Sequence, residues 1–136
     1  MNIEFLENLL NQISVSGSEE NGQRVLREYM EQYADEIRTD EIGDVICVLN
    51  PESPVRIMLS AHADEIGLVV TRITEEGRIQ AIERGGIMTH NYPGQKVKIC
   101  TKKGIVYGVV ECSRELLKKE TVKAADLLID IGAVSK

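Results

Sequence analysis

The sequence lacks the features that mark several common classes of protein. It has no excess of positive charge, because 16 Lys and Arg stand against 22 Asp and Glu, giving a formal net charge of -6. Binding to nucleic acid or to an anionic membrane depends on basic residues, so we expect neither as a partner. No apolar run approaches the roughly 20 residues that a membrane-spanning helix needs. The N-terminus also lacks the positive stretch and apolar core of a signal peptide, so we expect a cytoplasmic protein.

Cysteine is scarce, and its positions do not suggest a metal site. Cys47, Cys100 and Cys112 form an odd number without the paired spacing of zinc ligands. Cys47 and Cys100 lie in apolar stretches, so we expect buried thiols there. The chain has 43% hydrophobic and 28% charged residues over 136 positions. These values are typical of a globular protein that can bury a core, and they exclude a disordered or collagen-like chain.

The first part of the chain has the pattern of an α/β domain. Apolar residues recur at helical spacing in residues 3–13 and 18–33, and Ser18 can cap the second helix. Two short apolar runs, residues 45–49 and 55–61, follow, and neither alternates cleanly between polar and apolar. We therefore expect two strands covered on both faces, as in a helix-flanked sheet.

The second part has the pattern of a small antiparallel β module, barrel-like in form. Residues 68–73 and 78–83 flank a turn that ends in Gly77, and residues 95–101 and 105–112 flank a second turn. A short helical stretch at 116–123 and an apolar run at 127–131 close the sequence. The change in pattern places the boundary at about Gly67.

One short segment contains residues that could bind a metal. The run 55–61 is followed by His62 and Asp64, which lie at the end of the expected strand and two residues apart on one face. A neutral imidazole can bind a metal through one nitrogen while the other N–H donates to the carboxylate. This spacing alone is a weak signal. A hydrogen-bonded histidine beside a surface turn with Asp64 and Glu65 explains it equally simply.

The wider segment resembles a known family. His62-Ala63-Asp64-Glu65-Ile66-Gly67 followed by an apolar strand is similar to the metal-ligand strand of the glutamyl and deblocking aminopeptidases. This is metallopeptidase family forty-two, the tetrahedral aminopeptidases, for which an older label is endoglucanase. Other stretches resemble the family in the same order: residues 15–17, 40–46, 85–86, 94–97, 103–109 and 126–133.

The resemblance implies roles for particular residues and parts of the chain. His62 would bind one of two divalent ions, zinc or cobalt, and Asp64 would orient it. Residues 1–66 would be an incomplete N-terminal part of the catalytic domain, and residues 67–136 a slightly incomplete inserted β domain. The family hydrolyses the N-terminal bond of peptides and forms homo-oligomers through the β domain.

The remaining metal ligands and the general base of the family have no match before Lys136. Glu75-Glu76 lies in a turn, Glu19-Glu20 begins a helix and His90 lies in a loop, so we expect none of them to replace the missing groups. The isolated chain is therefore expected to bind metal weakly, to be inactive, and to self-associate through uncovered strand edges. One alternative is an oligomerisation or binding module without a catalytic role. A weaker one is a glycoside hydrolase, which would need a positioned pair of carboxylates.

Overall fold

The computed structural model describes residues 2–136 and consists of two compact units. Unit 1 is Met1–Glu65 and unit 2 is Ile66–Lys136. Unit 1 contains two helices and a two-stranded sheet, whereas unit 2 is built on a five-stranded antiparallel sheet. The expected α/β class, with an antiparallel β module in the second part, is confirmed.

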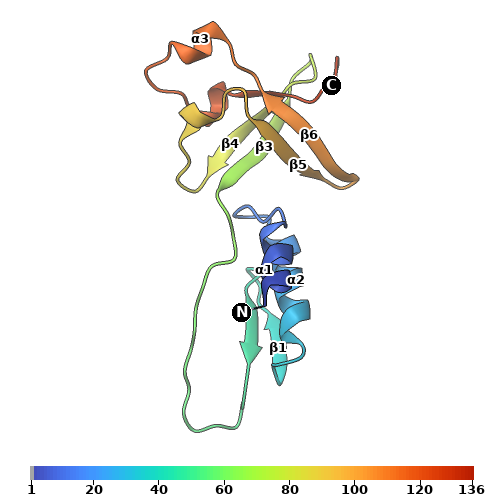
Figure 1. Cartoon of the computed structure of the whole chain (residues 1–136), viewed down its shortest axis with the longest axis vertical. Coiled ribbons are helices and arrows are strands. Elements are labelled where there is room, and N and C mark those ends of the chain that lie inside the picture. The colour runs from blue at the N-terminus through green and yellow to red at the C-terminus, as the bar shows by residue number, and fades with distance from the viewer. Residues whose placement is uncertain (1) are drawn as a thin grey trace. The chain divides into compact units, whose positions relative to one another are not determined.

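The helices of unit 1 are α1 (Ile3–Leu10) and α2 (Glu20–Met30), shown in Figure 1. The side chain of Asn2 caps α1 by accepting a hydrogen bond from the Phe5 amide. The two helices pack through Phe5 and Tyr29, whose ring centroids lie 3.8 Å apart. The predicted Ser18 cap is wrong. Glu19 is the N-cap of α2 and makes no capping bond, because its carboxylate accepts a hydrogen bond from the Gly17 amide instead.

The sheet of unit 1 is a hairpin of β1 (Glu36–Thr39) and β2 (Val45–Val48), paired from Glu36 opposite Val48 to Thr39 opposite Val45. Asp40 fixes the turn, since its carboxylate accepts hydrogen bonds from the amides of Ile42 and Asp44. The run at 45–49 is thus a strand as expected.

The run at 55–61 is not a strand, and this prediction is wrong. Residues 49–64 contain no helix or strand and form the long loop between β2 and β3 in Figure 1. The side chains of Ile57 and Leu59 are 84% and 94% exposed. A strand needs a neighbour to pair with its backbone groups. Among residues 2–65, β1 and β2 pair with each other, and the only further pairing is the isolated parallel bridge between Val15 and Glu65.

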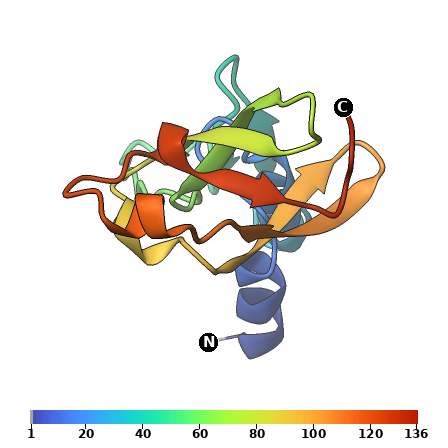
Figure 2. The same ribbon diagram turned by 90° about the horizontal axis from the view of Figure 1, so that it is seen from above.

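Unit 2 is a curled antiparallel sheet with the strand order β3-β4-β7-β6-β5 (Figure 2). The two expected hairpins are present as β3 with β4 and as β5 with β6. The apolar run at 127–131 supplies β7, which joins the two hairpins. The strands are β3 (Gly67–Ile73), β4 (Ile79–Arg84), β5 (Lys96–Thr101), β6 (Gly104–Val110) and β7 (Leu128–Asp130). β3 and β5 are the two edges of the sheet.

The expected helix at 116–123 is shorter and lies earlier than predicted. It is α3 (Arg114–Leu117), capped by the Ser113 side chain, which accepts from the Leu116 amide. The 3-10 turns η1 (Thr89–Asn91) and η2 (Ala124–Asp126) complete the unit. The helix ends at Leu117, and both Leu116 and Val122 are buried in the core. A helix continued to residue 123 would place these two side chains on different faces, so that they could not both point into the core.

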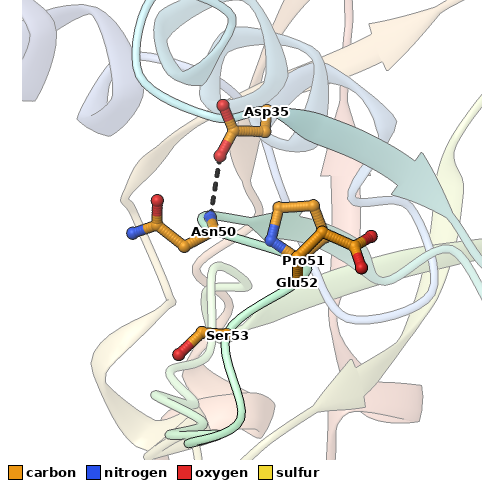
Figure 3. A pocket seen from close by; sticks show the side chains of 5 residues that line it. All are labelled: Asp35, Asn50, Pro51, Glu52 and Ser53. Carbon is orange, nitrogen blue, oxygen red and sulfur yellow. Dashed lines mark hydrogen bonds between the residues drawn. The ribbon is translucent and has the colours of Figure 1, made fainter.

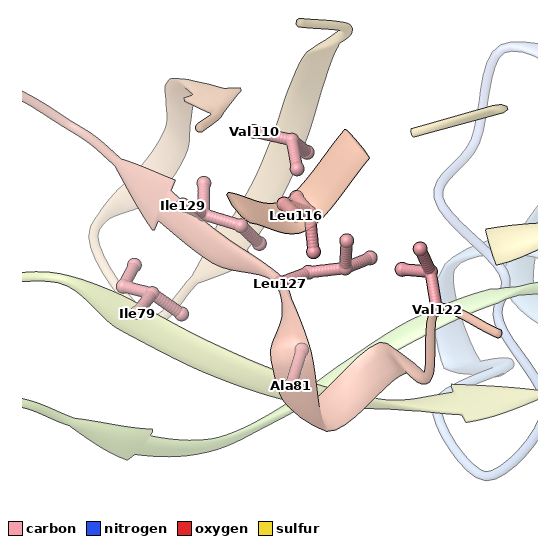
Figure 4. Close-up of a cluster of buried hydrophobic side chains, with 7 residues drawn as sticks. All are labelled: Ile79, Ala81, Val110, Leu116, Val122, Leu127 and Ile129. Atoms are coloured by element: carbon pink, nitrogen blue, oxygen red, sulfur yellow. The ribbon is translucent and has the colours of Figure 1, made fainter. Parts of the chain in front are cut away.

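The core of unit 2 lies between the sheet and the segment that contains α3 (Figure 4). Its buried members are Ile79, Ala81, Val110, Leu116, Val122, Leu127 and Ile129. The cysteines do not contribute to a core: Cys47 is half-buried and Cys100 is exposed, so the expectation of buried thiols is wrong. The helices among residues 2–136 are too short or too polar to span a membrane.

Candidate functional site

The imidazole of His62 is directed at Asp64 in unit 1. His62 Nδ1 lies 3.0 Å from Asp64 Oδ1 and 3.1 Å from the Asp64 backbone oxygen. The His62 side chain is 87% exposed. The two residues that the sequence singled out are therefore brought into contact, although the chain there is a loop and not the end of a strand.

Asp64 is held in place by a residue far away in the sequence. The Ser16 hydroxyl donates to Asp64 Oδ2 over 2.6 Å. This hydrogen bond, and then the one with His62, hold the pKa of the Asp64 carboxyl below its usual range. The carboxylate is consequently charged at neutral pH. It can accept the Nδ1 proton of a neutral imidazole.

Backbone contacts connect the two segments that carry these residues. The Glu65 amide donates to the Ser14 carbonyl over 2.8 Å, and the Ser14 amide donates to the Glu65 carboxylate over 3.1 Å. Glu65 thus fastens residues 14–16 beside residues 62–65. Sequence reasoning missed Ser16 as a contact of Asp64. Its only signal was its place in the stretch 15–17, which resembles the family.

The geometry suits His62 as one metal ligand but does not form a complete site. With Nδ1 donating to Asp64, the Nε2 lone pair on the exposed ring is the atom that can bind a cation. Within residues 2–136, no three His, Cys, Asp or Glu side chains lie together in a way that could hold a metal ion. A zinc site normally has three or four protein ligands. The described part of the chain therefore offers such a metal one ligand, the oriented imidazole of His62.

The other acidic and histidine candidates lie outside this arrangement. His90 is an exposed residue of η1 in unit 2. Glu75 and Glu76 are exposed in the turn between β3 and β4, as expected. Glu19 binds the Gly17 amide and Glu20 is the first residue of α2.

A shallow depression elsewhere in unit 1 does not include His62. It is lined by Asp35, Asn50, Pro51, Glu52 and Ser53 (Figure 3). The Asn50 amide donates to Asp35 Oδ2 over 2.7 Å, so this carboxylate serves to hold the end of β2. The depression is open, and we assign it no chemistry.

Comparison with known proteins gives a consistent result along the chain. The model of the family described as M42 glutamyl aminopeptidase matches residues 43–136. The lysyl aminopeptidase of Pyrococcus furiosus is 30% identical over 140 residues, which cover 98% of this chain and 40% of that protein. This chain thus spans about 40% of the length of this curated relative.

Solved structures agree with the family match. A TET aminopeptidase from a marine sediment archaeon of the Thaumarchaeota is 34% identical with a TM-score of 0.86, over 98% of this chain and 39% of that one. The TET1 peptidase of Pyrococcus horikoshii, which assembles into a tetrahedron or a large octahedral shell, is 36% identical with a TM-score of 0.83. That match covers 98% of this chain and 41% of the other.

Proposed function

The chain belongs to the M42 glutamyl aminopeptidase family, and from this premise we propose that it supplies one metal ligand, His62, to an aminopeptidase active site. The observation that carries the proposal is the contact of His62 Nδ1 with Asp64 Oδ1 at 3.0 Å. Asp64 fixes the tautomer and the direction of the ring, and Ser16 fixes Asp64. The proposed reaction is hydrolysis of the N-terminal bond of a peptide.

Divalent metal ions belong to the chemistry of this metallopeptidase family. When bound, a pair of zinc or cobalt ions supplies an activated water and polarises the peptide carbonyl. The chain's own part in this chemistry is to present Nε2 of His62, while the Nδ1–H of the same ring donates to the Asp64 carboxylate. Since no second and third ligand accompany His62 within residues 2–136, we propose that the chain alone binds metal weakly and is inactive.

We further propose that residues 1–66 are the N-terminal part of the catalytic domain and that residues 67–136 are the inserted β domain. The division at Glu65 and the antiparallel sheet of unit 2 support this assignment. We also propose a cytoplasmic location, which suits the exposed Cys100 and Cys112, since thiols stay reduced there.

The two histidines of the chain allow a controlled test of the ligand assignment. Zinc is titrated into the ¹⁵N-labelled chain while the imidazole nitrogens of His62 and His90 are followed by NMR. We expect Nε2 of His62 to shift in a weak, saturable manner, and we expect His62→Ala but not His90→Ala to remove that binding. Asp64→Asn should weaken it by about 10–100-fold, as the loss of an orienting carboxylate does elsewhere.

Two results would contradict these proposals. Equal shifts at both histidines would remove the special role of His62. Tight stoichiometric binding of zinc or cobalt, or turnover of an aminoacyl chromogenic amide by the isolated chain, would disprove the proposed weak binding and inactivity.

A second candidate function is assembly without catalysis, and the independent core of unit 2 favours it as a role for that unit (Figure 4). We propose that unit 2 mediates homo-oligomerisation. The assembly of the Pyrococcus horikoshii TET1 peptidase into closed shells supports this role by analogy. The two candidates rest on different units, because His62 lies in unit 1.

A further inference from the structure

The hairpin of β5 and β6 is strongly basic in an otherwise acidic chain. Residues 96–110 contain four lysines and no aspartate or glutamate, whereas the whole chain has a net charge of -6. All four lysines are exposed, and none takes part in an ion pair within residues 2–136. They are Lys96, Lys98, Lys102 and Lys103. Their charge is therefore available to a partner from outside.

The hairpin at the other edge of the sheet lacks this feature. Residues 67–84, which form β3, β4 and the turn between them, contain three arginines and three glutamates. Both β3 and β5 are edge strands of the same sheet. Of the two edges, only the one formed by β5 thus belongs to a hairpin with unbalanced positive charge.

The backbone of β5 directs hydrogen-bonding groups of two lysines away from the sheet. Gln95 faces β6, since its carbonyl accepts a hydrogen bond from the Val110 amide over 2.9 Å. In an antiparallel pair the backbone groups of successive residues point alternately to the two sides of the strand. The amide and carbonyl groups of Lys96 and Lys98 therefore point to the free side of β5, where the sheet ends. An added strand would pair with these groups.

The side chains of β5 differ between the two faces of the sheet. Lys96 and Lys98 are exposed on the outer face, whereas Val97 and Ile99 are half-buried and pack against the core. Residues directly opposite each other on paired strands share a face. A strand beside β5 would therefore match it best with acidic residues opposite the lysines and apolar residues opposite Val97 and Ile99.

The lysines also decide which kind of strand can pair with this edge. Lysine on an edge strand ordinarily protects a sheet against the addition of further strands. This protection acts against neutral and basic strands, because like charges directly opposite each other destabilise a pair, whereas opposite charges stabilise it. The edge of β5 is thus open to an acidic strand in particular.

We propose that the free edge of β5 binds an extended segment of another protein in which acidic and apolar residues alternate. The segment adds to the sheet as an antiparallel strand, with acidic side chains opposite Lys96 and Lys98. Backbone hydrogen bonds hold the segment, and the lysines select its sequence. Lys102 and Lys103 extend the positive charge to the end of the hairpin and attract the acidic segment. This site lies in unit 2 and does not depend on the ligand assignment of His62.

A blocked synthetic peptide tests the site directly. A short peptide of alternating valine and glutamate, with glutamate at its centre, is acetylated at its N-terminus, amidated at its C-terminus and titrated into the ¹⁵N-labelled chain. The acetyl group removes the free N-terminus on which an aminopeptidase acts, so the experiment is separate from catalysis. We expect the amide signals of Lys96 and Lys98 to shift in a saturable manner. The same peptide with lysine in place of glutamate should not bind.

Two lysine variants test the role of charge. Lys98→Glu should raise the dissociation constant of the acidic peptide about tenfold, because it replaces attraction by repulsion. Raising the salt concentration should reduce this difference, since exposed charges are screened. Lys118→Glu, which changes an exposed lysine directly after α3 by the same charge, is the matched control and should leave the dissociation constant unchanged. Amide spectra of both variants establish that unit 2 remains folded.

Two N-methylated peptides of equal charge distinguish strand addition from attraction of charge alone. In the proposed register the glutamates lie opposite Lys96 and Lys98, whose backbone groups face the free edge. The glutamate amides therefore donate to β5, and the valine amides point away from it. N-methylation of the central glutamate should abolish binding, whereas N-methylation of the neighbouring valine should preserve it.

Four outcomes would overturn the proposal. The first three are the absence of a saturable shift at β5, equal effects of Lys98→Glu and Lys118→Glu, and equal binding of the two methylated peptides. The fourth is a second copy of the chain on this edge, which would shift the amide signals of Lys96 and Lys98 when the chain is diluted without peptide. The zinc titration of His62 uses no peptide, so a failure of this site is distinguishable from a failure of the ligand assignment.

Discussion

The two units differ in how much of their structure is held by a core. Among residues 2–136, unit 2 buries eight hydrophobic side chains, whereas unit 1 buries one, Val25. In unit 1, consecutive apolar residues at 57–59 are almost fully exposed. Both units nevertheless have regular helices or strands. The difference shows that local signals, such as the Asn2 cap and the Asp40 turn, define the elements of unit 1, while packing defines those of unit 2.

The same contrast appears in the two long segments without strands. Residues 111–127 of unit 2 are tied to the core by the buried Leu116 and Val122. Residues 49–64 of unit 1 bury no apolar side chain. An apolar segment that is exposed in this way gains no hydrophobic stabilisation, which amounts to about 1.5–3 kcal/mol for each fully buried large side chain. Unit 1 is therefore expected to be the less stable part of the chain.

The largest expected effect is a difference in the free energy of unfolding between two leucine variants, one in each unit. Leu127 is 1% exposed in the core of unit 2, and Leu59 is 94% exposed in unit 1. Leu127→Ala should lower the free energy of unfolding of unit 2 by about 2–5 kcal/mol, because it leaves a cavity. Leu59→Ala should change the stability by no more than about 0.5 kcal/mol. A urea series followed by amide NMR signals measures each unit by its own residues.

The comparison between the units would fail if the two leucine variants were equally destabilised. That result would mean that residues 49–64 are covered in solution. Sedimentation equilibrium of a Leu59→Asp variant, compared with the unmodified chain, would then show whether a second copy of the chain provides the cover.

A smaller effect is expected from two glycines that are crowded in different ways. A Cβ on Gly108 would lie 2.7 Å from Ile129 Cγ2 and 3.0 Å from the Asp130 backbone oxygen. These atoms belong to the packed sheet, so Gly108→Ala should cost about 1–3 kcal/mol. A Cβ on Gly22 would lie 2.4 Å from the Ser14 hydroxyl oxygen and 3.2 Å from the Ser14 Cβ. The hydroxyl can rotate away, although it then loses its hydrogen bond to the Glu19 carbonyl.

Gly22→Ala should therefore be close to neutral, because the gain of up to about 1 kcal/mol from replacing glycine inside a helix offsets the displacement of Ser14. The same urea series measures both variants. A strongly destabilising Gly22→Ala would show that unit 1 is as rigidly packed around α2 as unit 2 is around β6.

The elements predicted well from the sequence are those whose information is local. The hairpins of unit 2 follow from short turns, and a residue such as Gly77, with φ of +79°, ends its turn at the predicted place. The run at 55–61 has the composition of a strand, but a strand also requires a partner, which composition does not reveal. The helix at 116–123 was misplaced because burial of Val122, a tertiary effect, outweighs the helical pattern.

In the candidate site, too, contacts between near neighbours in the sequence could be predicted, and distant contacts could not. The contact of His62 with Asp64 could be predicted because the two residues are neighbours in the sequence. Ser16, which is 48 residues from Asp64, could not be connected with it from spacing. Cys100 was wrongly expected to be buried, because its strand β5 is an edge and its side chain lies on the outer face opposite Ile105.

The smallest expected effect concerns how the 111–127 segment is fastened to unit 2. The Lys119 ammonium lies 2.6 Å from Asp126 Oδ1, and the Lys123 amide donates to Asp126 Oδ2. These contacts, the Lys119 one first, lower the pKa of the Asp126 carboxyl. A carboxyl whose pKa is lower in the folded state stabilises that state above its unfolded pKa, near 4. This contribution is lost as the pH falls through the depressed pKa.

Asp126→Asn keeps an oxygen for the Lys123 amide but removes the ion pair, so it should speed amide exchange in residues 116–126 at pH 7. The variant and the unmodified chain should converge at low pH, and Lys119→Met should reproduce the effect from the other partner. An equal difference at all pH values would show that the charge of Asp126 does not fasten the segment, and that the burial of Leu116 and Val122 alone distinguishes it from residues 49–64.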